Sequence, residues 1–186
     1  EDFQTNTFVG TGFVLANAGS QSADGYEFDL VISPTENIDL AVSGLFIDPI
    51  YDSYVGAAPG DLSGTVPSNT PEDTISSTVT WNYNFKGWDS FLRISHLYSS
   101  EAKLLENPAH QALIEAKGNG YREQDTINLT AGFEKDNISI KIWGKNINDD
   151  KFLTSAFIGV ADLSETTFYG YPNSFKSYGM TINYSF

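Results

Sequence analysis

Large apolar residues occupy every second position in several stretches of this chain. At its C-terminal end Tyr178, Met180, Ile182, Tyr184 and Phe186 alternate with small or polar residues. Side chains of an extended chain point alternately to two faces, whereas a helix would scatter the same residues around its circumference. The stretch therefore predicts a β-strand with one apolar and one polar face.

The same period of two recurs along the chain. The other apolar rows are Tyr26, Phe28, Leu30 and Ile32; Ile38, Leu40, Val42 and Phe46; Ile75, Val79, Trp81, Tyr83 and Phe85; Ile127, Leu129 and Phe133; and Ile138, Ile140 and Ile142. Residues 88–98 are less regular because Phe91 and Leu97 fall out of phase, which indicates a β-bulge there. The pattern predicts an all-β protein.

The connections between these rows alternate in length. "SPTE" (Ser33 to Glu36), "KG" (Lys86, Gly87) and "DN" (Asp136, Asn137) are short turns that join antiparallel neighbours. Between them lie long polar connections at 48–73, 99–125 and 149–173. Short turns at one end and long loops at the other are typical of outer-membrane barrels, with aromatic residues near the strand ends. A soluble β-sandwich also alternates apolar and polar positions, so periodicity alone leaves both architectures open.

Charge and composition exclude several classes of site and partner. The 186 residues include no cysteine, so neither a disulfide nor a thiolate metal site is expected. A formal charge of -14 argues against a nucleic-acid partner, because few basic groups are present to meet phosphates. The chain shows neither a signal peptide nor an apolar run long enough for a spanning helix, and strands that cross a membrane leave only a weak hydropathy signal.

The acidic residues concentrate in the long connections, which hold 14 of the 24 carboxylates against four basic residues. We interpret them as a solvated outer surface that tolerates divalent cations bridging neighbouring lipopolysaccharide. A dedicated calcium site near Asp48 and Asp52 is the weaker alternative, because no compact run of alternating aspartates occurs. The sequence predicts no bound metal and no cofactor.

The sequence offers little support for an enzyme. His96 lies in an expected strand and His110 in a long connection, and neither has a serine or an acid at a diagnostic spacing. We therefore expect no catalytic residues.

Three stretches together resemble the C-terminal end of a TonB-dependent outer-membrane receptor. They are "LANAGSQSADGYEFDL" (15–30), "INLTAGFEKDNISIKIWGKNINDDKF" (127–152), with its Asn-x-x-Asp at Asn146 and Asp149, and "YGYPNSFKSYGMTINYSF" (169–186). The resemblance implies a transmembrane antiparallel barrel, of which residues 1–186 supply about eight of roughly 22 strands. The implied strands are 2–8, 13–32, 37–47, 74–85, 88–98, 125–135, 138–148 and 174–186.

The resemblance also implies the partners. These are the plug domain and the remaining barrel strands of the same receptor, the TonB complex, outer-membrane lipid and lipopolysaccharide, and a small nutrient ligand, first of all an iron–siderophore complex. The signal peptide, TonB box and plug are expected outside this chain. In such receptors the row from Tyr178 to Phe186 is the barrel-assembly signal, and the last strand closes the barrel against its first. "PNSFKSYG" at Pro172 departs from the commoner Pro-Arg-x-x-Gly, which puts that arginine's contact in doubt.

Two alternatives stay open from the sequence. One is a stand-alone eight-stranded barrel acting as an adhesin or anchor, although the small inward residues suit a wide lumen better. The other is a soluble sandwich lectin. For a receptor, the aromatics of the first and last long connections are the expected ligand contacts, with packing within the loops as the competing interpretation. These aromatics are Tyr51, Tyr54, Phe168, Tyr169 and Tyr171.

Overall fold

The chain forms one large antiparallel sheet with a smaller one beside it. The computed structural model describes residues 2–9, 12–55, 60–158 and 167–186. The large sheet has the order β1-β2-β3-β4-β5-β6-β7-β10, and β8 pairs only with β9. The strands are β1 (Asp2–Val9), β2 (Gly12–Thr35), β3 (Ile38–Ser53), β4 (Asp73–Phe85), β5 (Trp88–Lys103), β6 (Tyr121–Lys135), β7 (Ile138–Lys145), β8 (Leu153–Ile158), β9 (Phe168–Pro172) and β10 (Ser177–Tyr184).

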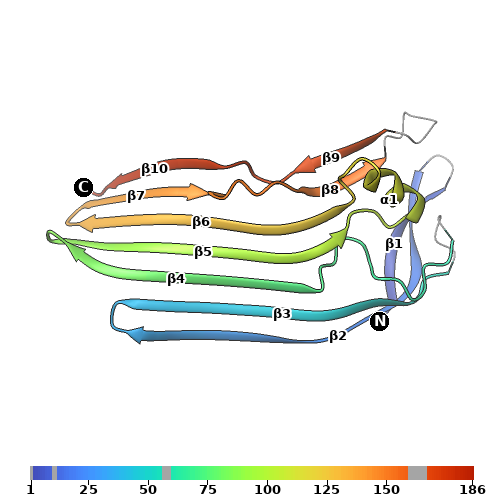
Figure 1. The fold of residues 1–186 in the computed structure, drawn as a ribbon, viewed down its shortest axis with the longest axis horizontal. Helices are drawn as coiled ribbons and strands as arrows, with labels where there is room; N and C mark the ends of the chain where they lie inside the picture. The colour runs from blue at the N-terminus through green and yellow to red at the C-terminus, as the bar shows by residue number, and fades with distance from the viewer. Residues whose placement is uncertain (1, 10–11, 56–59, 159–166) are drawn as a thin grey trace.

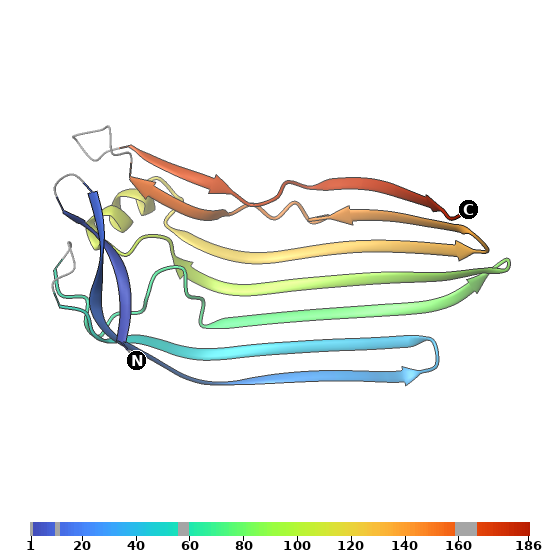
Figure 2. The same ribbon diagram turned by 180° about the vertical axis from the view of Figure 1, so that it is seen from behind.

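The two ends of the large sheet differ sharply (Figures 1 and 2). One end, here the turn end, carries the turns at residues 36–37, 86–87 and 136–137. The other, here the loop end, carries the connections after β3, β5 and β7, together with β8, β9 and the single described helix, α1 (Pro108–Glu115). The hairpin of β1 and β2 stands across the loop end. The predicted alternation of short and long connections is confirmed.

Local backbone chemistry explains the short turns. Lys86 and Gly87 both have positive φ, 54° and 82°, as a two-residue hairpin turn with the twist of its strands requires. Asp136 opens its turn with a φ of 51°, which aspartate tolerates better than most residues. The turn expected at Ser33 to Glu36 is displaced, because β2 continues to Thr35 and the turn falls on Glu36 and Asn37.

All eight expected strands are present, but several boundaries were wrong. β3 continues to Ser53 and β5 to Lys103, and β6 begins at Tyr121, because the backbone ladder continues beyond the end of the apolar alternation. By contrast, β7 ends at Lys145 and β10 spans only Ser177–Tyr184. β8, β9 and α1 lie inside connections for which no regular structure was expected.

The bulge expected within residues 88–98 is absent from the described ladder. β4 and β5 pair without a shift from Thr74↔Ser99 to Phe85↔Trp88, and the irregularity in β5 lies between Ser99 and Ala102. Phe91 is a regular member of the polar face. Its ring lies over Gly132 of β6, where an added Cβ would come within 2.1 Å of the Phe91 ring.

The large sheet is open. β1 and β10 occupy its opposite edges, and β10 pairs with β7 alone among the described strands. A stand-alone eight-stranded barrel would require these two edges to pair. The arrangement therefore does not favour that alternative.

Candidate functional site

The register of the sheet gathers the apolar rows on one face, here the apolar face. Across it, Val79 is opposite Ile94 and Ile94 is opposite Leu129. The row continues to the last strands, where Met180 is opposite Ile142. These side chains are largely uncovered: Met180 is 62% and Ile182 59% exposed. An apolar surface of this extent is unusual for a protein in water but typical of strands that face lipid.

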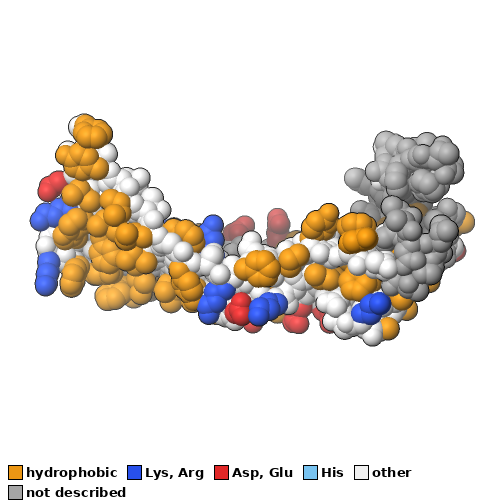
Figure 3. All heavy atoms as spheres, turned by 90° about the horizontal axis from the view of Figure 1, so that it is seen from above, with side chains coloured by type: hydrophobic (Ala, Val, Ile, Leu, Met, Phe, Trp, Pro, Cys, Tyr) orange, Lys and Arg blue, Asp and Glu red, His pale blue; other side chains and the backbone are white. Residues whose placement is uncertain are grey.

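The apolar face has the dimensions of a membrane-crossing surface. On β4 it runs from Ile75 to Phe85, close to the 9 to 11 residues that a tilted strand needs to cross a bilayer. Stacked aromatic pairs lie near its two ends, Tyr26 with Phe46 toward the loop end and Trp81 with Tyr83 toward the turn end. Figure 3 shows hydrophobic side chains gathered over the turn end, with basic groups at its tip. In the part of the chain that the structure describes, no helix is long and apolar enough to cross a membrane.

The first long connection has a small core of its own. Tyr51 and Tyr54 are 6% and 9% exposed and pack with Leu62, and their rings meet edge-on at 4.9 Å. Backbone hydrogen bonds hold the loop around them, from Gly64 N to Tyr51 O at 2.7 Å and from Leu62 N to Tyr54 O at 3.0 Å. Packing within the loop therefore accounts for both tyrosines.

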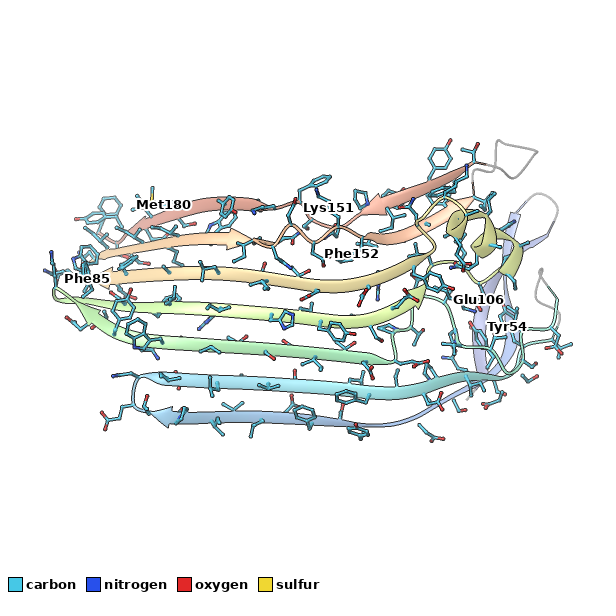
Figure 4. The ribbon with its side chains drawn as sticks, viewed as in Figure 1. Tyr54, Phe85, Glu106, Lys151, Phe152 and Met180 are labelled. Atoms are coloured by element: carbon cyan, nitrogen blue, oxygen red, sulfur yellow. The ribbon has the colours of Figure 1, made fainter. Side chains whose placement is uncertain are left out.

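Glu106 joins the first long connection to the second. Burial raises the pKa of Tyr51, and the charge of Glu106 and its hydrogen bond with the Tyr51 side chain raise it further. Glu106 Oε2 also accepts from Ser68 N at 2.9 Å, and Asn69 N donates to Lys103 O at 2.8 Å. Figure 4 shows Glu106 and Tyr54 together at the loop end.

The helix α1 organises the second connection. Asn107 caps it by accepting from Ala109 N at 2.9 Å, and Pro108 occupies its first turn. Gln111, 6% exposed, donates to Gly120 O at 2.5 Å and accepts from Leu105 N at 2.9 Å. The Asn107-Pro108 pair is the sequence signal for this helix, which was not among the expected elements.

Asn146 organises the base of the third connection. It is 3% exposed, has a φ of 50°, and donates through Nδ2 to Asp150 O at 2.8 Å and Ser174 O at 2.9 Å. Asn173 Nδ2 donates to the same Asp150 carbonyl at 2.8 Å. The Asn-x-x-Asp stretch is thus a structural anchor, in which the Asn146 side chain bonds to Asp150, the residue after the expected Asp149.

The hairpin of β8 and β9 presents an exposed aromatic row. Tyr169 and Tyr171 are 54% and 59% exposed, and the ring of Phe157 lies 5.3 Å from the first and 6.0 Å from the second. Phe168 is opposite Ile158 and alternates to the other side of the hairpin. Phe157 was missed because no strand was expected in this connection.

An acidic hollow of about 630 Å³ lies at the loop end. Four of its carboxylate residues come from regular elements: Glu101 of β5, Glu115 of α1, and Glu123 with Asp125 of β6. The hydrogen bond with Glu115 raises the pKa of Tyr121, and partial burial and the charges of Glu115 and Glu101 add to this. The third connection completes the hollow with Asp150, Lys151, Phe152 and Leu153. Figure 4 shows Lys151 and Phe152 between the two sheets.

His96 and Asp52 each have a side-chain hydrogen-bond partner. His96 Nε2 lies 2.6 Å from Asp125 Oδ1, an acid partner that the sequence spacing did not reveal. Asp52 accepts a hydrogen bond from Ser22 at 2.7 Å. Within the described ranges, no group of three or more histidine or acidic side chains is placed to hold a metal ion.

No protein-family model and no curated protein matches the chain. Solved structures do match. The ferric yersiniabactin uptake receptor FyuA from Yersinia pestis aligns over 93% of this chain and 25% of the receptor, with 14% identity and a TM-score of 0.72. The ferric preacinetobactin receptor BauA from Acinetobacter baumannii aligns over 99% of this chain and 25% of the receptor, with 12% identity and a TM-score of 0.64. The chain has the fold of a receptor barrel segment. It spans about a quarter of the length of the receptors it matches.

Within this barrel segment, the five expected ligand-contact residues fall into two clusters. Tyr51 and Tyr54 form loop core, whereas Tyr169 and Tyr171 are exposed with Phe157, and Phe168 faces the other way. Cargo contact by these residues stays a prediction, and the exposed pair is the better placed.

The last strand has the expected alternation. Tyr178, Met180, Ile182 and Tyr184 lie on the apolar face, and the Tyr184 and Phe186 rings meet edge-on at 5.2 Å. The free edge of β10 offers backbone groups to a further strand. The role of this row in barrel assembly, and closure against a first strand, stay predictions.

Proposed function

We propose that the chain forms part of the wall of an outer-membrane receptor that captures a scarce nutrient and imports it with energy from the TonB complex. The continuous apolar face between short turns and large loops carries this proposal, because it separates a lipid-facing band from a cargo-facing end. The match to two siderophore receptors makes an iron–siderophore complex the first cargo to test.

The proposed partners lie on different sides of this wall. A plug domain and the remaining strands of the same receptor complete the barrel, and the plug carries the contact with the TonB complex. Outer-membrane lipid and lipopolysaccharide surround the apolar face. The acidic loop end tolerates divalent cations that bridge lipopolysaccharide, since its carboxylates outnumber its basic groups.

The proposed role is not catalytic and uses no cofactor. His96 and Asp125 form a pair, but among the described residues no hydroxyl group hydrogen-bonds to that histidine. A hydrolytic triad needs such a nucleophile next to the base. Recognition by the loops and transport through the lumen require no group of this kind.

Uptake measurements test the proposal. Cells that depend on the full-length protein are starved of iron and given a panel of radiolabelled ferric siderophores. We expect one siderophore class to be bound and taken up, with uptake but not binding abolished by removing TonB or collapsing the proton gradient. Uptake that is independent of TonB would contradict the energised mechanism. Extraction of the protein without detergent would contradict the membrane location.

A further inference from the structure

A second hollow lies on the apolar face at the turn end. It measures about 230 Å³ and is lined by Phe85, Lys86, Trp88, Phe133 and Ile140. Four of these side chains are apolar and come from four neighbouring strands, β4 to β7. The walls of the hollow are therefore mainly apolar and suit a hydrocarbon chain. The hollow opens on the face that we propose contacts lipid.

One lysine lines this hollow and a second, at the end of β6, reaches the turn beside it. Lys86 Nζ lies 5.4 Å from the centre of the Phe85 ring. Lys135 Nζ lies 3.9 Å from the position that a Cβ on Gly87 would occupy, so it reaches the same turn. Neither ammonium group has an ion-pair partner within 4.0 Å in the described part of the chain.

The acids of this region lie mainly on the opposite side of the sheet. Asp89 pairs with Glu134 across the ladder, and both alternate away from the apolar row that contains Phe133. Asp136, in the turn after Lys135, is the remaining acid next to that lysine in the sequence. The third short turn carries Glu36 and no lysine, so the pair of basic groups is particular to this hollow.

We propose that this hollow binds one anionic glycerophospholipid from the leaflet next to the short turns. An acyl chain fills the apolar pocket, and the phosphate lies between the ammonium groups of Lys86 and Lys135. Charge complementarity selects the lipid, because a general aromatic girdle would bind any headgroup, whereas two lysines favour a negative one. The inference rests on the membrane placement proposed above and adds to it a specific lipid at a specific place.

Native mass spectrometry of the full-length protein tests the site. The protein is reconstituted in an equal mixture of phosphatidylglycerol and phosphatidylethanolamine and then stripped of lipid by increasing collision energy. We expect one phosphatidylglycerol to be retained. K86Q/K135Q should weaken its binding by about 25-fold, since each lysine near a lipid surface contributes roughly a factor of five. I140W should reduce retention of both lipids by filling the pocket.

K176Q is the matched control. Lys176 also lies over an aromatic ring, 5.9 Å from the centre of Tyr178, but it is remote from the hollow. It should retain phosphatidylglycerol like the wild type. Equal retention by K86Q/K135Q and wild type, or no preference between the two lipids, would overturn the lipid site and leave the membrane placement intact. Displacement of the lipid by a second copy of the protein would also overturn it. Failure of the protein to enter the bilayer would overturn both.

Discussion

Asn146 and Asp150 exchange two hydrogen bonds. The Asn146 side chain donates to the Asp150 carbonyl and accepts from the Asp150 backbone N–H, both at 2.8 Å. Through this pair the end of β7 holds the start of the third long connection, and the second bond of Asn146 Nδ2, to Ser174 O, holds its return. The buried Asn146 amide therefore ties together the two ends of the connection that carries the β8–β9 hairpin, and Asn173 adds a further bond to Asp150 O.

Replacement of that amide should release the hairpin. Asn146→Ala leaves several buried backbone groups unsatisfied, and we expect a loss of about 2 to 4 kcal/mol from the local unfolding free energy. Limited proteolysis of the 149–173 connection measures the loss. Asn146→Gly is the matched control for backbone strain, because glycine accepts the φ of 50° without cost. Equal protease resistance of wild type and both variants would contradict the anchoring role.

Phe91 and Gly132 should behave as a coupled pair. Gly132→Ala places a methyl group within 2.1 Å of the Phe91 ring, so we expect about 1 to 3 kcal/mol of destabilisation from overpacking. In a Phe91→Ala background the same change should cost much less. Urea unfolding of the four proteins of this double-mutant cycle gives the coupling energy. Additive effects would show that the ring does not depend on the glycine.

The packing around Tyr51 should weaken at alkaline pH. Its pKa is raised above the ordinary value of 10.0, so the folded loop keeps the phenol proton that the unfolded chain loses. The stabilisation is fully present below about pH 10 and is lost as the pH rises further. Tyr51→Phe should remove this component of the alkaline loss, as measured by thermal unfolding from neutral to alkaline pH. Tyr171→Phe, at an exposed site, is the matched control for a tyrosine-to-phenylalanine change.

Cargo binding should depend on the exposed aromatics of the hairpin more than on the buried tyrosines. Tyr169→Ala with Tyr171→Ala should weaken cargo binding about tenfold or more at unchanged amounts of receptor on the cell surface. Tyr51→Ala with Tyr54→Ala should instead destabilise the first long connection by roughly 3 to 5 kcal/mol for each large aromatic side chain lost. Surface binding, normalised to receptor amount, separates these outcomes. Unchanged binding by the hairpin variant would refute its role in recognition.

The sequence predicted the sheet well because the strands follow a simple alternation of apolar and polar residues. In a single-layer sheet the period of two decides which face each residue takes, and the rows beginning at Tyr26, Ile75 and Ile138 align in the structure as expected. The bulge predicted from Phe91 was wrong because an aromatic residue on the polar face, over Gly132, breaks the apolar pattern without breaking the ladder.

The loop end could not be predicted in the same way. Its order comes from contacts between distant residues, such as Glu106 with Ser68 and Asn173 with Asp150. No local period encodes these hydrogen bonds. The burial of Tyr51 and Tyr54 follows from the same contacts, and so the sequence alone left packing and ligand binding as competing interpretations.

Two neighbouring positions in the last strand should differ in how much stability a charged substitution costs. Met180 lies on the apolar face and is 62% exposed, whereas Thr181 lies on the polar face. If the apolar face contacts lipid, Met180→Arg places a guanidinium group in hydrocarbon and should cost about 2 to 4 kcal/mol, according to its depth. Thr181→Arg, one residue away, should change the stability by less than about 0.5 kcal/mol. Refolding of the full-length protein into lipid vesicles under urea measures both. Equal tolerance of the two substitutions would mean that water, and not lipid, covers the apolar face, because an exposed arginine costs nothing in water.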